Sequence, residues 1–285
     1  MIPISDLIFI LKKVYVLKKI LLLTSISIFL FSCKEEKKNT NLDYENPYNQ
    51  PDTNLTYSNP VFKPVLADPS VLQAGNYFYA YGTEDDWGSD GGYHCVPVIR
   101  SSNLVDWELV GDAFNTKPNW KSGGIWAPDV SFINGQYFMY YSFSLCGDPD
   151  PGIGYAIATQ PEGPYVDQGK LFLSSEIGVN NSIDPFYIEE NGTKYLFWGS
   201  FQGIYAIELA ADGKSVTGEK THIASNHLEA SYIYHKDGYY YYFGSQGSCC
   251  DGFNSSYHVK VGRSENILGP YTDKNGNKLT DGAFG

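Results

Sequence analysis

A short pattern of polar and apolar positions recurs four times along the chain. Each copy has a carboxylate, a short apolar run, a turn and then a strongly aromatic run. The copies begin at Asp68, Asp129, Asp184 and Glu229. The turn is Asn-Gly or Asp-Gly in the second, third and fourth copies, and these pairs adopt the positive φ angles of a two-residue hairpin turn. Each copy is therefore predicted to form a β-hairpin.

Further strand-like runs lie between these hairpins. They are Val96–Arg100 before Trp107–Val110, Ile153–Thr159 before Tyr165–Val166, Ile204–Leu209, and His258–Arg263 before Pro270–Tyr271. Two hairpins per unit make a four-stranded blade, and a spacing of 45 to 61 residues between lead carboxylates is typical of a β-propeller. A β-sandwich with similar turns is the weaker alternative, because it does not explain the fourfold repeat. The sequence therefore predicts an all-β propeller with four recognisable blades.

The four lead carboxylates are the first candidates for chemistry. The innermost strand of each blade lines the central channel, so a carboxylate at its start is expected to point into one shared funnel. Clustered carboxylates repel one another, which raises some of their pKa values and suits acid and base roles. Hydrolysis of a glycosidic bond needs such a pair. A single carboxylate would be explained as well by capping of a turn, but four in register favour a site.

Composition narrows the class of partner. The formal net charge of −12 argues against nucleic acid, which requires a basic surface, and weakly against a polyanionic substrate. Aromatic residues make up 16% of the chain. Their rings suit both strand packing and stacking on sugar faces, and most are expected to serve packing.

The N-terminal region predicts export. Basic residues precede an apolar run at 20–31, and this run is short for a membrane-spanning helix, so residues 1–33 are interpreted as a signal peptide. The tetrad 30–33 resembles a bacterial lipobox, which makes Cys33 the predicted lipidation site. Residues 34–59 are interpreted as a tether, and 34–38 resemble the charged segment with which some lipoproteins reach the outer surface. The alternative is a plain cleaved signal followed by a linker.

Several motifs, in this order and spacing, resemble glycoside hydrolase family 43, and in particular its endo-α-1,5-L-arabinanases. They are Ala67-Asp68-Pro69-Ser70, Ile125-Trp126-Ala127-Pro128-Asp129, Asn181-Ser182-Ile183-Asp184-Pro185, Leu196-Phe197-Trp198-Gly199-Ser200-Phe201, His227-Leu228-Glu229-Ala230 and Gly247-Ser248-Cys249-Cys250. The resemblance runs from about residue 59 to residue 282. It implies a five-bladed β-propeller that hydrolyses arabinan or arabino-oligosaccharides with inversion at the anomeric carbon.

The resemblance also implies roles for individual residues. Asp68 is expected to be the general base, Glu229 the general acid, and Asp184 the residue that orients the acid and raises its pKa. Inversion requires the base and acid to stand roughly 6.5–9.5 Å apart so that a water molecule fits between them. Asp129 matches a supporting position and is not counted as catalytic.

Three further residues are expected to bind sugar. Trp126 is a candidate for stacking on a sugar ring, although a tryptophan beside Ala-Pro is also suited to packing. Asn181 and Ser182 precede Asp184 and are candidates for hydrogen bonds to sugar hydroxyls.

The chain departs from the family pattern after Tyr271. Family arabinanases continue into a fifth blade, whose histidine is associated with a central calcium ion, and nothing after Tyr271 matches it. We therefore expect a catalytic domain over 60–285 that is truncated at its C-terminus and lacks the fifth blade. No cofactor is expected to be required for the chemistry, and no metal-binding residue is assigned.

Three functions are compatible with the sequence. The first is internal cleavage of α-1,5-L-arabinan. The second is exo action by the same family, as an α-L-arabinofuranosidase or a β-xylosidase. The third is a glycan-binding lipoprotein without catalysis, which the complete set of three carboxylates disfavours.

Overall fold

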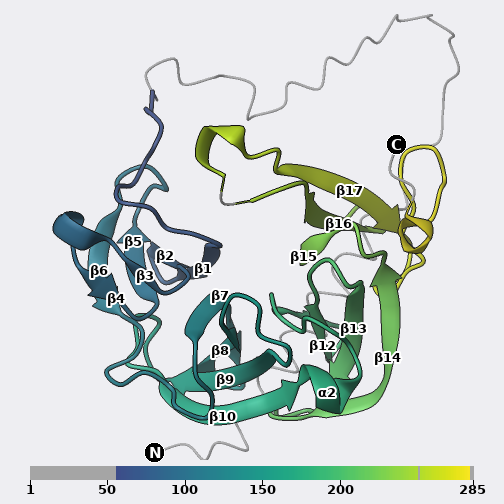
Figure 1. Cartoon of the computed structure of the whole chain (residues 1–285), viewed down its shortest axis with the longest axis horizontal. Helices are drawn as coiled ribbons and strands as arrows, with labels where there is room; N and C mark the ends of the chain where they lie inside the picture. Colours follow the sequence, from purple (N-terminus) through teal and green to yellow (C-terminus); the bar gives the residue numbers. More distant parts are fainter. Residues whose placement is uncertain (1–55, 250, 283–285) are drawn as a thin grey trace, which may run out of the picture. The chain divides into compact units, whose positions relative to one another are not determined.

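The structure is a computed structural model that describes residues 56–249 and 251–282. The predicted signal peptide, the lipidation site Cys33 and most of the predicted tether lie outside the described residues. Within the described part the chain is nearly all β, with four antiparallel sheets that we call blades 1 to 4 in chain order (Figure 1). No helix among these residues is long and apolar enough to cross a membrane.

Every blade is assembled from strands that are consecutive in the chain, apart from one inserted hairpin in blade 1. Blade 1 contains β1 (Ser70–Ala74), β2 (Tyr77–Tyr81), β5 (Pro97–Ser101) and β6 (Glu108–Asp112). Blade 2 contains β7 (Gly124–Ile133), β8 (Gln136–Ser144), β9 (Gly152–Ala158) and β10 (Val166–Leu173). Blade 3 contains β11 (Phe186–Glu190), β12 (Thr193–Trp198), β13 (Ile204–Leu209) and β14 (Val216–Ala224). Blade 4 contains β15 (Glu229–Lys236), β16 (Tyr239–Gln246) and β17 (His258–Ser264).

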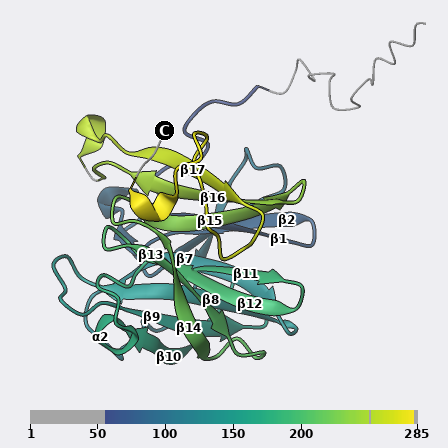
Figure 2. The same cartoon turned by 90° about the vertical axis from the view of Figure 1, so that its right-hand side faces the viewer.

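Short elements join these strands. The inserted hairpin of β3 (Asp85–Asp86) and β4 (Tyr93–His94) lies between β2 and β5, and a one-turn helix, α2 (Ser174–Ile177), leads into blade 3. The remaining elements are the 3₁₀ turns η1 (Gly88–Asp90), η2 (Gly252–Asn254) and η3 (Leu279–Asp281). Figure 2 turns blades 3 and 4 toward the viewer, with β15, β16 and β17 above β11 and β12.

The four predicted hairpins are confirmed. Residues Asn134, Asn191 and Asp237 open their turns at φ angles of 51°, 52° and 53°, and the glycine after each also has a positive φ. In the first hairpin Gly75 alone supplies the positive φ, at 59°. In each case a two-residue loop closes a pair of antiparallel strands, as Asn-Gly and Asp-Gly turns require.

The outer strands of blades 3 and 4 differ from the prediction. β14 was not predicted, because most of its residues are exposed and give no apolar periodicity. The predicted strand at Pro270–Tyr271 is wrong, since neither residue lies in a strand, and the next residue, Thr272, forms only isolated bridges with Arg263 and Lys278. Blade 4 accordingly has three strands within the described residues.

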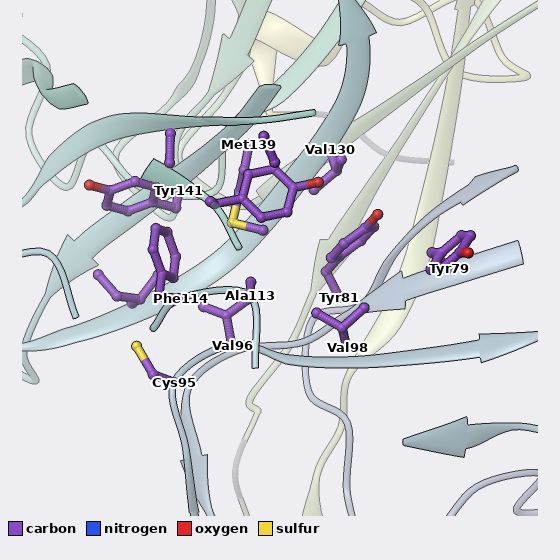
Figure 3. Packing of buried hydrophobic residues seen from close by; sticks show 14 of the residues in the cluster. Tyr79, Tyr81, Cys95, Val96, Val98, Ala113, Phe114, Val130, Met139 and Tyr141 are labelled. Atoms are coloured by element: carbon purple, nitrogen blue, oxygen red, sulfur yellow. The ribbon is translucent and has the colours of Figure 1, made fainter. Parts of the chain in front are cut away.

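Many aromatic residues of the described chain pack between blades. One buried cluster lies between blades 1 and 2, a second between blades 2 and 3, and a third between blades 3 and 4. Figure 3 shows the first cluster, with Tyr79, Tyr81 and Val98 of blade 1 beside Val130, Met139 and Tyr141 of blade 2. In the second cluster Tyr140 and Tyr187 stack at 5.8 Å between ring centroids. Each cluster buries large apolar side chains from two neighbouring blades, which fixes the orientation of one blade against the next.

Candidate active site

One residue with an unusual backbone conformation lies near the start of the innermost strand of each blade, either just before it or within its first four residues. These residues are Asp68, Ala127, Asp184 and Ala230, with φ angles of 48°, 42°, 58° and 60°. Each lies seven residues before the first residue of its hairpin turn. Left-handed backbone is uncommon outside glycine and carries a cost, so its recurrence at one place indicates a shared structural demand.

That demand is a contact between neighbouring blades. The backbone N–H of the left-handed residue donates to an acceptor near the end of the second strand of the preceding blade. The contacts are Ala127 N to Thr83 Oγ1 at 2.9 Å, Asp184 N to Ser142 Oγ at 2.8 Å, and Ala230 N to Gly199 O at 3.0 Å. The three acceptors occupy equivalent places after their hairpin turns. We call these three contacts the inter-blade hydrogen bonds.

The positions of the left-handed residues correct the expectation that the four lead carboxylates occupy equivalent places in their blades. Asp68 and Asp184 do occupy it, but Asp129 lies two residues after Ala127, and Glu229 lies one residue before Ala230. Irregularities in strand pairing, between Trp126 and Asp129 in β7 and just after Glu229 in β15, accompany both offsets. An inserted residue changes the direction in which the neighbouring side chains point.

Asp68 is exposed and held by one hydroxyl. Thr83 Oγ1 lies 2.6 Å from Asp68 Oδ2. The same Thr83 oxygen accepts the N–H of Ala127, so its single proton is directed at the carboxylate. Blade 2 thereby fixes the hydroxyl that orients Asp68 in blade 1.

Asp184 is half-buried, and no described group donates a hydrogen bond to its carboxylate. Burial raises the pKa of Asp184 well above its ordinary value, and the negative charges of Glu229 and Asp68 raise it further. The three carboxylates therefore interact electrostatically, although they come from three different blades. This brings together the three residues that the sequence predicted as catalytic.

Glu229 accepts hydrogen bonds at both carboxylate oxygens. Ser200 Oγ lies 3.0 Å from Oε1, and the Tyr257 hydroxyl donates to Oε2. Ser200 follows β12 in blade 3 and also forms a backbone bridge with Glu229, while Tyr257 precedes β17. The side chain of Glu229 is thus held from two sides.

Asp129 does not join this group. It is not among the charges that act on Asp184, and its Oδ2 accepts the backbone N–H of Tyr187 at 2.7 Å. Burial raises the pKa of Asp129 to about 7, and the N–H of Tyr187 opposes that rise. The expectation that Asp129 would point into the shared funnel with the other three carboxylates is wrong, because its carboxylate binds blade 3 instead.

The three predicted sugar-binding residues differ in accessibility. Trp126 is half-buried next to Ala127, and its indole covers Gly124. Asn181 is half-buried and donates from Nδ2 to Ser200 O at 2.9 Å, which supports the residue that binds Glu229.

Ser182 is fully buried, at 0% exposure. Its hydroxyl donates to Val179 O at 2.8 Å and accepts the indole N–H of Trp198 at 3.1 Å. Since no part of this hydroxyl faces solvent, we leave Ser182 out of the proposed sugar contacts.

The metal that the resemblance associates with this family has no evident site in the part of the chain that the structure describes. No three His, Cys, Asp or Glu side chains lie together there in an arrangement that could hold an ion.

Sequence reasoning missed the hydroxyl groups that hold the carboxylates. Thr83 and Ser200 each follow a glycine at the end of the second strand of a blade, as Ser245 also does. A hydroxyl that recurs after Gly82, Gly199 and Gly244 was a usable signal. Tyr257 had none, since it lies in a loop between strands.

Comparison with known proteins decides the family. The family model of glycosyl hydrolases family 43 matches residues 57–283. The chain belongs to glycosyl hydrolases family 43. It is therefore a glycoside hydrolase, as its carboxylates suggested, and family 43 arabinanases are β-propellers.

This family 43 chain is similar to arabinan-degrading proteins. It is 34% identical over 235 residues to the extracellular endo-alpha-(1->5)-L-arabinanase 1 of Bacillus subtilis, covering 76% of this chain and 71% of the relative. It is 28% identical over 246 residues to the extracellular exo-alpha-(1->5)-L-arabinofuranosidase ArbA of Cellvibrio japonicus, covering 75% and 68%. Among solved structures, the Cellvibrio cellulosa alpha-L-arabinanase complexed with arabinohexaose superimposes with a TM-score of 0.68 at 28% identity, over 78% of each chain.

The raised pKa of Asp129 predicts a pH-dependent gain in stability for the variant Asp129→Asn. Between its ordinary pKa of 3.8 and about 7, the unfolded chain ionises Asp129 while the folded chain does not, so folded stability falls as pH rises through this window. Asparagine removes this loss and keeps an oxygen for the Tyr187 N–H. The variant should match the parent near pH 4 and exceed it by up to about 4 kcal/mol above pH 7, at ~1.4 kcal/mol for each pH unit of the shift.

Urea unfolding at several pH values measures this gain. Asp237→Asn, at the exposed turn of blade 4, is the matched control and should show no pH-dependent gain. A gain for Asp129→Asn that is equal at pH 4 and pH 8 would contradict the burial of an ionisable group.

Proposed function

We propose that this family 43 hydrolase cleaves α-1,5-L-arabinan internally and inverts the anomeric carbon. The observation that carries the proposal is the convergence of Asp68, Asp184 and Glu229 from blades 1, 3 and 4, close enough for Glu229 and Asp68 to act on Asp184. Glycoside hydrolysis by inversion requires a base that activates water and an acid that protonates the leaving oxygen. The three carboxylates supply both roles and one further charge.

Asp68 acts as the general base in this proposal. Its exposed carboxylate is accessible to water, and Thr83 holds Oδ2 by a hydrogen bond. This hydrogen bond fixes the orientation of the carboxylate. Oδ1 remains to accept a proton from the attacking water molecule.

Glu229 acts as the general acid, and Asp184 controls its protonation. No described group donates a hydrogen bond to the Asp184 carboxylate, so a proton shared with its neighbours is what relieves its charge. Two nearby carboxylates do not readily ionise together, and such a pair retains a proton to higher pH than one carboxyl alone. That proton is available to the leaving oxygen.

The substrate class follows from the relatives. The Bacillus subtilis relative is named an endo-acting arabinanase, and the Cellvibrio cellulosa structure contains arabinohexaose. Exo action is the second candidate, because the Cellvibrio japonicus relative is named an exo-acting arabinofuranosidase. Trp126, beside the left-handed residue Ala127, is proposed to stack on a sugar ring, and Asn181 to contact a sugar hydroxyl.

The kinetics of two variants should separate base from acid. Asp68→Ala removes the base, so hydrolysis of every substrate should fall by about 10²–10⁴-fold. Glu229→Ala removes the acid, so hydrolysis of linear arabinan, which has a poor leaving group, should fall by about the same factor. The leaving group of an aryl arabinoside needs little protonation, so the rate of hydrolysis of this substrate should fall far less.

The measurement is kcat/KM for both variants on linear arabinan and on the aryl arabinoside. Glu189→Ala, at the far end of the inner strand of blade 3, is the control for loss of a carboxylate away from the site. Equal losses on both substrates for Glu229→Ala would exclude it as the acid. Near-normal activity of Asp68→Ala would exclude the proposed mechanism and favour a glycan-binding function.

We also propose that the protein is exported and anchored to the cell envelope through a lipid on Cys33. Two relatives are named extracellular, which supports export. The lipobox-like tetrad 30–33 and the charged segment 34–38 support the anchor.

Replacement of Cys33 by Ser should move the full-length protein from the detergent phase to the aqueous phase in a Triton X-114 partition. The expected reason is loss of the acyl chains, each of whose buried methylene groups contributes ~0.8 kcal/mol to membrane binding. Cys146→Ser, which changes an exposed cysteine of the propeller, is the control and should remain in the detergent phase. Unchanged partitioning of Cys33→Ser would rule out the anchor.

A further inference from the structure

The two hydrogen bonds to Glu229 come from side chains with different surroundings. Ser200 is 1% exposed, and its backbone forms the bridge with Glu229, so it belongs to the packed interface of blades 3 and 4. Tyr257 is 40% exposed and belongs to the segment between η2 and β17. Of the two donors, only Tyr257 can leave without disturbing the sheet.

The direction of the Tyr257 proton is fixed. The phenol donates to Glu229 Oε2, an oxygen that in the carboxylate can only accept. Burial and the negative charge of Glu229 raise the pKa of Tyr257, so the phenol keeps its proton throughout the neutral range. Tyr257 therefore acts as a donor that favours the ionised form of Glu229.

This arrangement conflicts with the role of an acid. A general acid carries its proton on one carboxyl oxygen and points that proton at the leaving oxygen. Oε1 is directed at Ser200, within the blade interface, and Oε2 is occupied by Tyr257. The exposed Tyr257 hydroxyl occupies an acceptor position of Oε2, so a leaving oxygen that approaches Oε2 from the Tyr257 side must take its place.

We propose that Tyr257 is a positioning residue that holds Glu229 Oε2 in the free protein and is displaced by the leaving oxygen when the glycan binds. The inference rests on the proposed role of Glu229 as the acid. It makes the protonation of Glu229 depend on occupancy of the site. In the free state the phenol favours the carboxylate, and in the complex its departure lets Glu229 hold the proton that catalysis uses.

The other ionisable groups around Glu229 act in the same way in both states. Asp184, ahead of β11, faces Glu229, and Asp68 faces Asp184 from blade 1. Tyr242 of β16 also faces Asp184 and is fully buried, which raises its pKa and keeps it neutral. Tyr257 is the one group in this set that is both exposed and hydrogen-bonded to Glu229.

The pH dependence of Tyr257→Phe tests the displacement. The profile of kcat/KM reports the free enzyme, and the profile of kcat reports the complex. Loss of the phenol hydroxyl should move the alkaline limb of kcat/KM upward by about one pH unit and leave the alkaline limb of kcat unchanged. Ser200 is expected to remain hydrogen-bonded to Glu229 in both the free protein and the complex. Ser200→Ala should therefore move both limbs upward.

Tyr234→Phe is the matched control, since Tyr234 is an exposed tyrosine of β15 in the same blade. It should leave both profiles unchanged. If Tyr257→Phe moves both limbs equally, Tyr257 remains on Glu229 in the complex and the displacement is wrong. If it moves neither, the hydrogen bond does not influence the acid and the proposal is also wrong.

A readout without turnover separates this inference from the proposed function. The ¹³C carboxyl resonance of Glu229, assigned by its loss in Glu229→Gln, can be titrated in the free protein. Tyr257→Phe should move its titration to higher pH whether or not arabinan is a substrate, and an unchanged titration would overturn the inference. An inactive parent protein that shows this shift would instead count against the proposed function.

Discussion

The inter-blade hydrogen bonds are the contacts on which the site depends. In each, the backbone N–H of a residue with positive φ donates to an acceptor at the end of the second strand of the preceding blade. Leaving such a group unpaired costs ~1–3 kcal/mol where it is buried. By avoiding this cost, the hydrogen bonds offset the strain of left-handed backbone at Ala127 and Ala230. Alanine lacks the local side-chain hydrogen bonding that helps aspartate adopt this conformation.

These contacts also determine where the carboxylates stand. Asp184 donates its own N–H to Ser142, which fixes the start of β11 against blade 2. Thr83 accepts from Ala127 and donates to Asp68, so the same oxygen joins two blades and orients a carboxylate. Glu229 is adjacent to Ala230, whose N–H binds Gly199. Packing of neighbouring blades and convergence of charge are therefore consequences of one repeated geometry.

The three carboxylates of the site differ in the hydrogen bonds that stabilise their negative charge. Asp68 and Glu229 receive hydrogen bonds from hydroxyl groups, whereas Asp184 receives none at its carboxylate. Burial and like charge act together on Asp184, and its raised pKa is their result. An arrangement that leaves one carboxylate without compensation is unfavourable for folding but suits a site that must hold and release a proton.

Much of the fold followed from local sequence. The Asn-Gly and Asp-Gly turns have few alternative structures, and each fixes the pairing of its own strands. The catalytic candidates Asp68, Asp184 and Glu229 were also identified in advance, through a resemblance of ordered motifs. The exposed strand β14 was not, because a strand with little buried surface leaves no apolar pattern to detect.

Features that depend on contacts between blades could not be predicted from sequence. The position of Asp129 requires knowledge of the irregular pairing in β7, which arises only when β7 meets β8. The burial of Ser182 depends on Trp198 from the following hairpin. The approach of Tyr257 to Glu229 joins two segments of blade 4 that are 28 residues apart in the chain.

The central claim is that these three carboxylates cleave arabinan internally with inversion. Proton NMR of the first products from linear α-1,5-L-arabinan, recorded before the anomers equilibrate, tests it most directly. The account predicts oligosaccharides whose new reducing ends have the β configuration. Oligosaccharides that first appear with α reducing ends, or release of arabinose alone, would contradict it.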